Sequence, residues 1–337
     1  MEVFTCCTLL VLGCLLYAVV QLVRLVKADA DLTLLWAERF GSSPESKLRG
    51  AVVWVTGASS GIGEELCYQL AKLGASLILS SRRKDELLRV KRKCLEISSL
   101  EEKDLLVVPL DLIDIGAHKA ATDMVIKYFG RIDILVNNGG RSQRSLFVDT
   151  GLDVYQGLMN LNYIGTVSIT KHVLPHMIER KRGKIITLSS ITGLIGVPLS
   201  TGYAASKHAL QGFFNSLRVE MGAYPDIEII NICPGPVKSK VVENACTEQY
   251  ETSVETVTDQ THKMATDRCV RLILVSAANN LKEAWIADQP YLILYYLWQY
   301  APTWGWWITQ KGGQKRIQNF KSGIDADSTL VFSKKTS

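Results

Sequence analysis

The sequence predicts an α/β fold built on a doubly wound parallel sheet of Rossmann type, with an N-terminal membrane anchor and an aromatic C-terminal extension. Short apolar segments rich in β-branched residues alternate with helical segments between about residues 51 and 233. A glycine-rich turn joins the first of these strands to the first helix. Polar motifs follow the strands, at the edge where sheets of this kind bind ligands.

Strands and helices are expected in alternation along the chain. The first strand, Ala51 to Thr56, is apolar, and the helix from Ile62 to Leu73 carries apolar residues at helical spacing. Further strands are expected at 76–81, 105–110, 132–137, 184–189 and 228–233. Further helices are expected at 84–98, in a segment that ends at residue 129, at 152–179 and around residue 203. Strands that alternate with helices imply helices on both faces of the sheet.

The glycine-rich turn has the composition of a dinucleotide site. Gly57, Gly61 and Gly63 allow a tight turn, a close approach of backbone to a pyrophosphate, and close packing of helix on strand. Ser59 and Ser60 are expected to cap the following helix, which begins near Ile62 and points its positive end at the phosphates. A glycine turn can also end an ordinary strand, but a strand before it and a helix after it favour the nucleotide.

The end of the second strand indicates which dinucleotide is bound. An NAD site places an acidic residue about 20 positions after the glycines, where it binds the ribose hydroxyls. Here Ser81 stands at that place, followed by Arg82 and Arg83. Two guanidinium groups suit a 2′-phosphate, so NADP(H) is the expected cofactor. The alternative is a basic loop on a solvated edge.

A serine, a tyrosine and a lysine have the spacing of a proton-transfer site. Tyr203 follows Ser190 by 13 positions, and Lys207 follows Tyr203 by four. Residues four apart share one face of a helix, so the Lys207 ammonium is expected to favour the ionised form of Tyr203. The Ser190 hydroxyl is expected to hold a substrate oxygen. A tyrosine and a lysine at this spacing also occur by chance in many helices.

In their order along the chain, these motifs resemble those of the short-chain dehydrogenase/reductase family over about residues 50 to 288. The motifs are TGASSGIG at 56–63, Asp111 after the third strand, NNGG at 137–140, and PGPV at 234–237 with Ser239 following. The family usually has alanine in place of one glycine of NNGG and threonine in place of Ser239. The resemblance implies a catalytic tetrad of Asn162, Ser190, Tyr203 and Lys207. It assigns the remaining cofactor contacts to Asp111, Asn138, Pro234, Gly235, Val237 and Ser239.

The resemblance implies an NADP(H)-dependent oxidoreductase that interconverts a carbonyl and an alcohol, most simply as a reductase. A membrane location and the retinal-type branch of the family point to a lipophilic substrate such as a retinoid, steroid or quinone. The alternative is a protein that senses NADP(H), or acts as a scaffold, without turnover. An intact tetrad argues against that alternative. A homodimer is compatible with either interpretation.

Composition and charge narrow the class of protein. The chain has 337 residues, of which 47% are hydrophobic and 21% charged, enough for one large core. The net charge is only +5, so no nucleic-acid partner is expected. Eight cysteines are scattered without metal-ligand spacing, so we expect packing residues and no metal site.

The N-terminus is expected to anchor the protein in a membrane. Val3 to Val23 carries no charge and is long enough to cross a bilayer, and Arg24 and Lys27 follow it. A cleaved signal peptide is the alternative, although a basic segment before the apolar stretch is missing. The two basic residues favour a cytosolic catalytic domain by a narrow margin that leaves the orientation open. Among cellular membranes we expect that of the endoplasmic reticulum.

Two aromatic segments flank the predicted domain. Leu32, Leu35, Trp36 and Phe40 share a helical face that either lies on the bilayer or packs on the domain. The stretch 291–308 holds eight tyrosines and tryptophans, and it is expected either to contact lipid or to cover the substrate pocket. The predicted organisation is an anchor at 1–27, an amphipathic linker at 28–49, a catalytic domain at 50–289 and the extension at 290–337.

Overall fold

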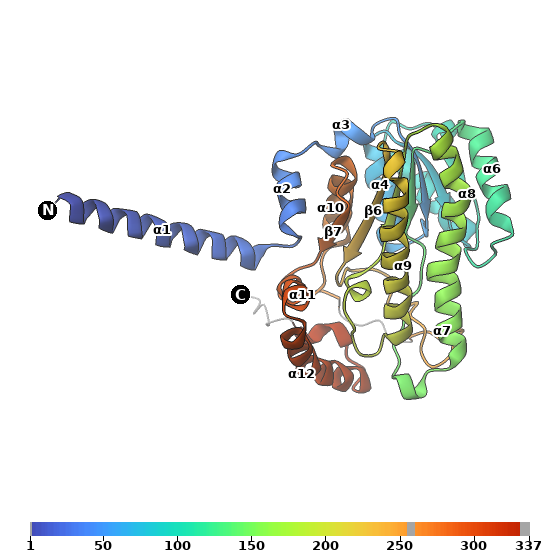
Figure 1. The fold of residues 1–337 in the computed structure, drawn as a ribbon. Coiled ribbons are helices and arrows are strands. Elements are labelled where there is room, and N and C mark those ends of the chain that lie inside the picture. The colour runs from blue at the N-terminus through green and yellow to red at the C-terminus, as the bar shows by residue number, and fades with distance from the viewer. Residues whose placement is uncertain (1, 255–259, 331–337) are drawn as a thin grey trace.

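A seven-stranded parallel sheet forms the centre of the computed structural model, which describes residues 2–254 and 260–330 (Figure 1). Met1 of the predicted anchor and residues 331–337 of the predicted extension lie outside the described residues. The strand order is β3-β2-β1-β4-β5-β6-β7. The strands are β1 (Val52–Thr56), β2 (Ser76–Ser80), β3 (Leu105–Val107), β4 (Ile134–Asn137), β5 (Gly183–Leu188), β6 (Ile227–Pro234) and β7 (Glu283–Ile286).

Alternate residues of the strands supply two cores, one on each face of the sheet. In β1, Val53 and Val55 face one core, whereas Val52 and Trp54 face the other. The first core packs against helices α4 (Gly61–Lys72), α5 (Lys84–Ile97) and α10 (Thr266–Ala278). The second packs against helices α6 (Ala117–Phe129), α8 (Gly165–Glu179) and α9 (Thr201–Glu220). The doubly wound parallel sheet predicted from the sequence is therefore confirmed.

Three elements differ from the sequence-based expectation. The third strand ends at Val107 rather than residue 110. The long helix expected at 152–179 is interrupted: α7 (Leu152–Leu158) leads into a π-helical turn, η3 (Met159–Ile164), before α8 begins. A seventh strand, β7, completes one edge of the sheet beside β6. With only four residues and no run of β-branched side chains, β7 has little sequence signal.

The N-terminal segment has two parts: a helix that lies outside the domain and, from about residue 28, a stretch that contacts the domain. Helix α1 (Glu2–Lys27) extends away from the domain in Figure 1, and its apolar window from Leu10 to Lys27 is not buried. The chain then pairs with the sheet edge, because Ala30 forms an antiparallel bridge with Ile286 of β7. This bridge covers part of an edge that would otherwise offer unpaired backbone groups.

The amphipathic linker packs on the domain through one face and exposes the other. Helix α2 (Leu32–Phe40) buries Leu34 and Ala37 in the first core, beside α10, and exposes Trp36 and Phe40. A short helix, α3 (Pro44–Leu48), completes the connection to β1. Of the two alternatives for this segment, packing on the domain is the one that the buried face supports.

The C-terminal extension is helical, and it too has both buried and exposed apolar side chains. Helix α11 (Tyr291–Tyr300) buries Leu292 and Tyr295, whereas helix α12 (Pro302–Lys321) exposes Trp304 and Trp307. The chain then turns back through the short helix η6 (Ala326–Leu330) toward the domain. The remaining short helical turns are η1 (Glu102–Asp104), η2 (Phe147–Asp149), η4 (Ile191–Gly193) and η5 (Met221–Ala223).

The cysteines whose side chains the structure describes behave mainly as packing residues. Cys14 on α1 is exposed, and the other five are buried and unpaired: Cys67, Cys94, Cys233, Cys246 and Cys269. The side chains of Cys6 and Cys7 lie outside the described set.

Candidate active site

A cavity of about 480 Å³ opens at the carboxyl ends of the strands, where the predicted motifs converge. Nearly all the residues predicted to bind cofactor or substrate line it. Gly63 and Asn162 are the two exceptions, and both lie just behind the lining. The lining includes Gly57, Ser59, Ser60, Gly61, Ile62, Ser81, Arg82, Arg83, Asp111, Asn138, Ser190, Tyr203, Lys207, Pro234, Gly235, Val237 and Ser239.

The glycine turn between β1 and α4 has the geometry that only glycine tolerates. Gly57 and Gly61 have positive φ angles of 66° and 59°. A Cβ at Gly63 would lie 2.3 Å from the carbonyl oxygen of Gly57, so the helix could not pack this closely with any other residue. The turn therefore brings bare backbone and the N-terminus of α4 to the cavity, which fits the pyrophosphate of a dinucleotide.

The expected serine cap of α4 is wrong. Ser60 occupies the N-cap position without a side-chain hydrogen bond to the helix. Instead, Arg83 Nη2 lies 3.1 Å from the Ser59 hydroxyl oxygen and 3.4 Å from that of Ser60, and donates to both. The guanidinium after β2 thus competes for the hydroxyls and leaves the first amides of α4 without a side-chain cap.

Asp111 follows strand β3 and Asn138 follows strand β4, and both line the cavity. Asn138 Nδ2 donates to the carbonyl oxygens of Thr56 (3.0 Å) and Gly57 (3.2 Å), so it holds the glycine turn against β4. Asp111 accepts a hydrogen bond from the Ile113 amide, at 3.1 Å, and borders the cavity.

Ser190 and Tyr203 both line the cavity. Ser190 follows β5, and its hydroxyl donates to the Pro234 carbonyl oxygen at 3.3 Å. Tyr203 lies in the first turn of α9. Burial raises the pKa of Tyr203, and the Ser190 hydroxyl and the Arg144 guanidinium oppose that rise. The expected lowering of this pKa by Lys207 is not seen, because burial of the phenol outweighs the groups that favour its ionised form.

Lys207 lies one turn further along α9 and is buried. Its ammonium donates to the carbonyl oxygen of Leu188 at 2.7 Å and lies 5.7 Å from the centre of the Tyr203 ring. Burial lowers the pKa of Lys207 to about 8. The lysine is therefore close to its titration range at physiological pH.

Asn162 lies in the π-helical turn η3, a distortion that is frequent at functional sites. Its amide oxygen accepts from the Arg141 amide at 2.8 Å, and its Nδ2 donates to the Arg141 carbonyl oxygen and to Ser206 on α9. Asn162 thus fixes the turn that follows β4 against the helix of Tyr203.

The segment after β6 closes the cavity on its far side. Ser239 lies opposite the glycine turn, since a Cβ at Gly61 would be 3.1 Å from the Ser239 Cβ. The Ser239 amide donates to Gln260 at 3.1 Å. Pro234, Gly235 and Val237 complete this wall, as the sequence motif implied.

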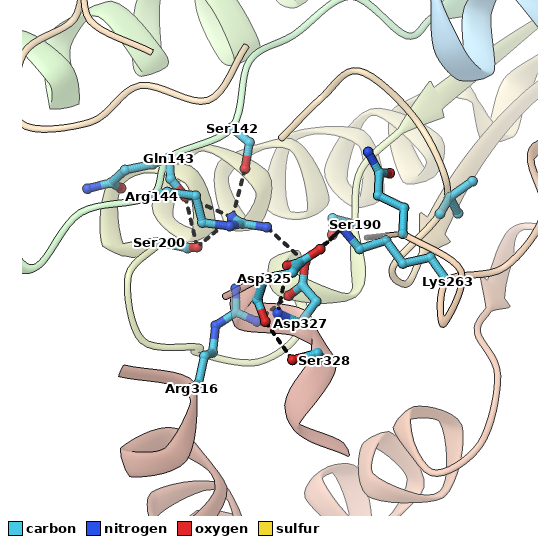
Figure 2. A network of polar contacts seen from close by, with 12 residues as sticks. Ser142, Gln143, Arg144, Ser190, Ser200, Lys263, Arg316, Asp325, Asp327 and Ser328 are labelled. Atoms are coloured by element: carbon cyan, nitrogen blue, oxygen red, sulfur yellow. Dashed lines mark hydrogen bonds and ion pairs between the residues drawn. The ribbon is translucent and has the colours of Figure 1, made fainter. Parts of the chain in front are cut away.

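Sequence reasoning missed three polar residues directly after the NNGG turn. Arg141 holds the loop across the cavity, because its guanidinium donates to the carbonyl oxygens of Asn244 (2.6 Å), Tyr250 (2.5 Å) and Thr252 (3.1 Å). Gln143 and Arg144 are buried beside the start of α9 (Figure 2). Their distant partners leave no local pattern, and the only signal was a run of polar residues, RSQR, after a strand.

Comparison with known proteins agrees with this geometry. A family model described as short chain dehydrogenase matches residues 51–250. A human protein named dehydrogenase/reductase SDR family member 7 is 65% identical over 321 residues, covering 95% of each chain. The mouse protein of the same name is 61% identical, covering 97% of this chain and 96% of its own.

Solved structures share the fold at low sequence identity. An alcohol dehydrogenase from the archaeon Thermococcus sibiricus, solved with 5-hydroxy-NADP, superposes with a TM-score of 0.61 and 19% identity over 71% of this chain and 97% of its own. A short chain dehydrogenase/reductase from Burkholderia phymatum, solved with NAD, gives a TM-score of 0.65 and 18% identity over 83% and 97%.

The strand order, the glycine turn and the family model thus agree over the same part of the chain. This chain belongs to the short-chain dehydrogenase/reductase family of NAD(P)-dependent oxidoreductases.

Proposed function

We propose that the chain is an NADPH-dependent reductase that converts a carbonyl group of a lipophilic small molecule to an alcohol. The observation that carries this proposal is the placement of Ser190, Tyr203 and Lys207 together in the cavity formed by the glycine turn. A bound nicotinamide would supply the hydride. The chain's own residues would then orient the carbonyl oxygen and protonate it.

Tyr203 is the proposed proton donor. Its raised pKa keeps the phenol protonated at neutral pH, which suits the acid of a reduction. The Ser190 hydroxyl would hold the substrate oxygen beside the phenol. Lys207 would stabilise the tyrosinate left after proton transfer. Asn162 would position a water that returns the proton, the role that the family resemblance implies.

The proposed preference for NADP(H) rests on the end of β2. Ser81, Arg82 and Arg83 border the cavity there, and Arg83 reaches the two serines of the glycine turn. Two guanidinium groups beside three hydroxyls suit a 2′-phosphate through charge-assisted hydrogen bonds. The two solved relatives contain different dinucleotides, so the family fold by itself does not decide between them.

A membrane location would explain a lipophilic substrate. Helix α1 is apolar and long enough to cross a bilayer, with Arg24 and Lys27 in its last turn. The aromatic side chains exposed on α2 and α12 suit the headgroup region next to such an anchor. We propose the endoplasmic reticulum as the membrane and retinoids, steroids or quinones as the substrate class.

A substrate screen tests the proposal directly. The full-length protein, solubilised in detergent, is mixed with carbonyl compounds of each class, and oxidation of NADPH is followed by absorbance. We expect turnover with at least one lipophilic carbonyl, and faster turnover with NADPH than with NADH. Tight NADPH binding without turnover of any carbonyl or alcohol would instead favour a sensor or scaffold.

A further inference from the structure

Two carboxylates of the C-terminal segment lie in a buried cluster of positive charges (Figure 2). The Asp327 carboxylate lies 3.0 Å from Arg144 Nη2 and is also paired with Arg316 of α12. The neighbouring Asp325 pairs with Lys263 at 2.5 Å, in the segment that leads to α10. Ion pairs therefore connect four segments that are distant in the sequence, around residues 144, 263, 316 and 327.

The negative and positive charges of this cluster stabilise each other. Burial acts to raise the pKa of Asp327, but Arg316, Arg144 and Lys263 outweigh it and hold that pKa well below its usual range. The three cationic side chains therefore favour the ionised form of Asp327. A buried charge without a partner is costly, so loss of the carboxylate would leave the buried Arg144 guanidinium without its ion-pair partner and would destabilise its present position.

Arg144 in turn supports the start of α9. Its Nη1 donates to the Gln143 carbonyl oxygen at 2.8 Å and to the Ser200 hydroxyl at 3.2 Å. Ser200 is the N-cap residue of α9, but its side chain does not bond to the helix. Instead, Gln143 Oε1 accepts hydrogen bonds from the amides of Gly202 (2.7 Å) and Tyr203 (3.3 Å). A glutamine held by Arg144 thus caps the helix turn that carries Tyr203.

We propose that Asp327 is a positioning residue for the reaction: through Arg144 it fixes the Gln143 cap of α9 and so the place of Tyr203. The C-terminal segment would then be part of the active-site framework rather than a membrane-contacting appendage alone. This inference rests on the proposed role of Tyr203 as proton donor.

The electrostatics of Tyr203 give the inference a specific signature. After burial and the Ser190 hydroxyl, Arg144 and Asp327 have the largest effects on the pKa of Tyr203, and they act in opposite directions. Arg144 lowers that pKa and Asp327 raises it. The Lys207 ammonium also lies near the ring, 5.7 Å from its centre. Removing one partner of the Arg144–Asp327 pair should therefore shift the titration of Tyr203 in a direction set by the partner that remains.

The test compares Asp327→Asn, Asp327→Glu and Arg144→Gln in the full-length protein. We expect Asp327→Asn to lower kcat by about ten- to 100-fold, the loss typical of a misplaced reacting group, with an unchanged KM for NADPH. Asp327→Glu should restore much of the rate. Tyrosinate absorbance, measured as the difference between each variant and its Tyr203→Phe counterpart, should show a lower pKa of Tyr203 in Asp327→Asn and a higher one in Arg144→Gln.

Glu38→Gln is the matched control, because Glu38 forms a half-buried ion pair with Arg268 between α2 and α10, away from the cavity. It should lower the thermal midpoint without changing the titration of Tyr203. If Asp327→Asn and Arg144→Gln behave like Glu38→Gln, the segment has only a structural role and the inference is wrong. If Asp327→Asn does not fold, the Arg144→Gln titration decides. Retained turnover in Tyr203→Phe would instead refute the proposed role of Tyr203 as proton donor, on which this inference rests.

Discussion

The ammonium of Lys207 lies 5.7 Å from the centre of the Tyr203 ring and is hydrogen-bonded to the Leu188 carbonyl oxygen rather than to the phenol. The two residues share one face of α9, as a spacing of four predicts. Both are shifted by burial, which favours their neutral forms: the pKa of Tyr203 is raised, and that of Lys207 is lowered to about 8. Burial therefore dominates the pKa of both residues, in opposite directions.

Replacement of Tyr203 by phenylalanine should remove nearly all turnover. The ring and its packing are kept while the proton donor is lost, and a positioned acid contributes about 10²–10⁴-fold to rate. Stopped-flow or steady-state NADPH oxidation measures the rate, and fluorescence of bound NADPH serves as the control for an intact cofactor site. A variant that keeps a large fraction of the wild-type rate would remove Tyr203 from the mechanism.

Titration of Lys207 should appear in the pH dependence of cofactor use. Its pKa of about 8 in the folded protein lies below the ordinary lysine value of 10.5, so the ammonium is present at lower pH and is lost as the pH rises through about 8. We expect kcat/KM for NADPH, which reports the free enzyme, to fall over that range. Lys207→Arg cannot lose its charge there, so its profile should stay flat. A wild-type profile that is level through this range contradicts the assignment.

The arginines after β2 should determine cofactor choice. Ser81→Asp combined with Arg82→Ala should shift preference from NADPH toward NADH, because hydrogen bonds to charged groups contribute about 1.5–3 kcal/mol. Arg83→Ala, which removes the contacts to Ser59 and Ser60, should weaken NADPH binding further. The readout is the ratio of kcat/KM for the two cofactors. An unchanged ratio would place the 2′-phosphate elsewhere in the cavity.

Two helical glycines should respond differently to alanine. A Cβ at Gly63 would lie 2.3 Å from the Gly57 carbonyl oxygen, so Gly63→Ala must displace the glycine turn and abolish cofactor binding. Gly212, in the middle of α9, has open space around the added Cβ. Gly212→Ala should raise the free energy of unfolding by roughly 0.5–1 kcal/mol, because alanine is the better helix former. Calorimetry and NADPH titration distinguish the two outcomes.

Local patterns account for what the sequence could predict. Three motifs were predictable: the glycine turn, the two arginines after β2 and the Tyr203–Lys207 pair. Within each motif the residues are only a few positions apart, so their spacing in the sequence largely determines their geometry. The parallel, doubly wound character of the sheet followed from the alternation of strands and helices, because parallel strands need helical crossovers. The π-helical turn at Asn162 could not be predicted, because one turn of this kind inside a longer helical segment leaves no clear signal in the hydrophobic pattern.

Contacts between distant segments explain what could not be predicted. Asp327 meets Arg144 across 183 positions of sequence, and Asp31 caps α2 while accepting a hydrogen bond from the Trp285 amide at 2.8 Å. Such pairs depend on how the whole chain folds, and neither partner lies in a recognisable motif. The balance of burial against charge at Tyr203 is a tertiary property for the same reason.

The exposed tryptophans should hold the protein on a membrane after helix α1 is removed. Trp304 and Trp307 on α12 are 70% and 61% exposed, whereas Tyr295 on α11 is buried in the domain. Loss of residues 1–27 therefore leaves an aromatic face that can insert its rings at the headgroup level without spanning the bilayer. Attachment should survive high salt, since few basic residues contribute, and be released by mild detergent.

The test is fractionation of the truncated protein with and without Trp304→Ser and Trp307→Ser. Trp306 is left unchanged because its ring packs 4.4 Å from that of Trp298. The matched control is Met124→Ser with Tyr128→Ser, at two exposed residues of α6. This helix lies on the opposite side of the domain from α1 (Figure 1). We expect the tryptophan variant to become soluble and the control to stay on membranes. If the truncated protein is fully soluble with its tryptophans intact, α12 does not hold the protein on membranes and this prediction is wrong.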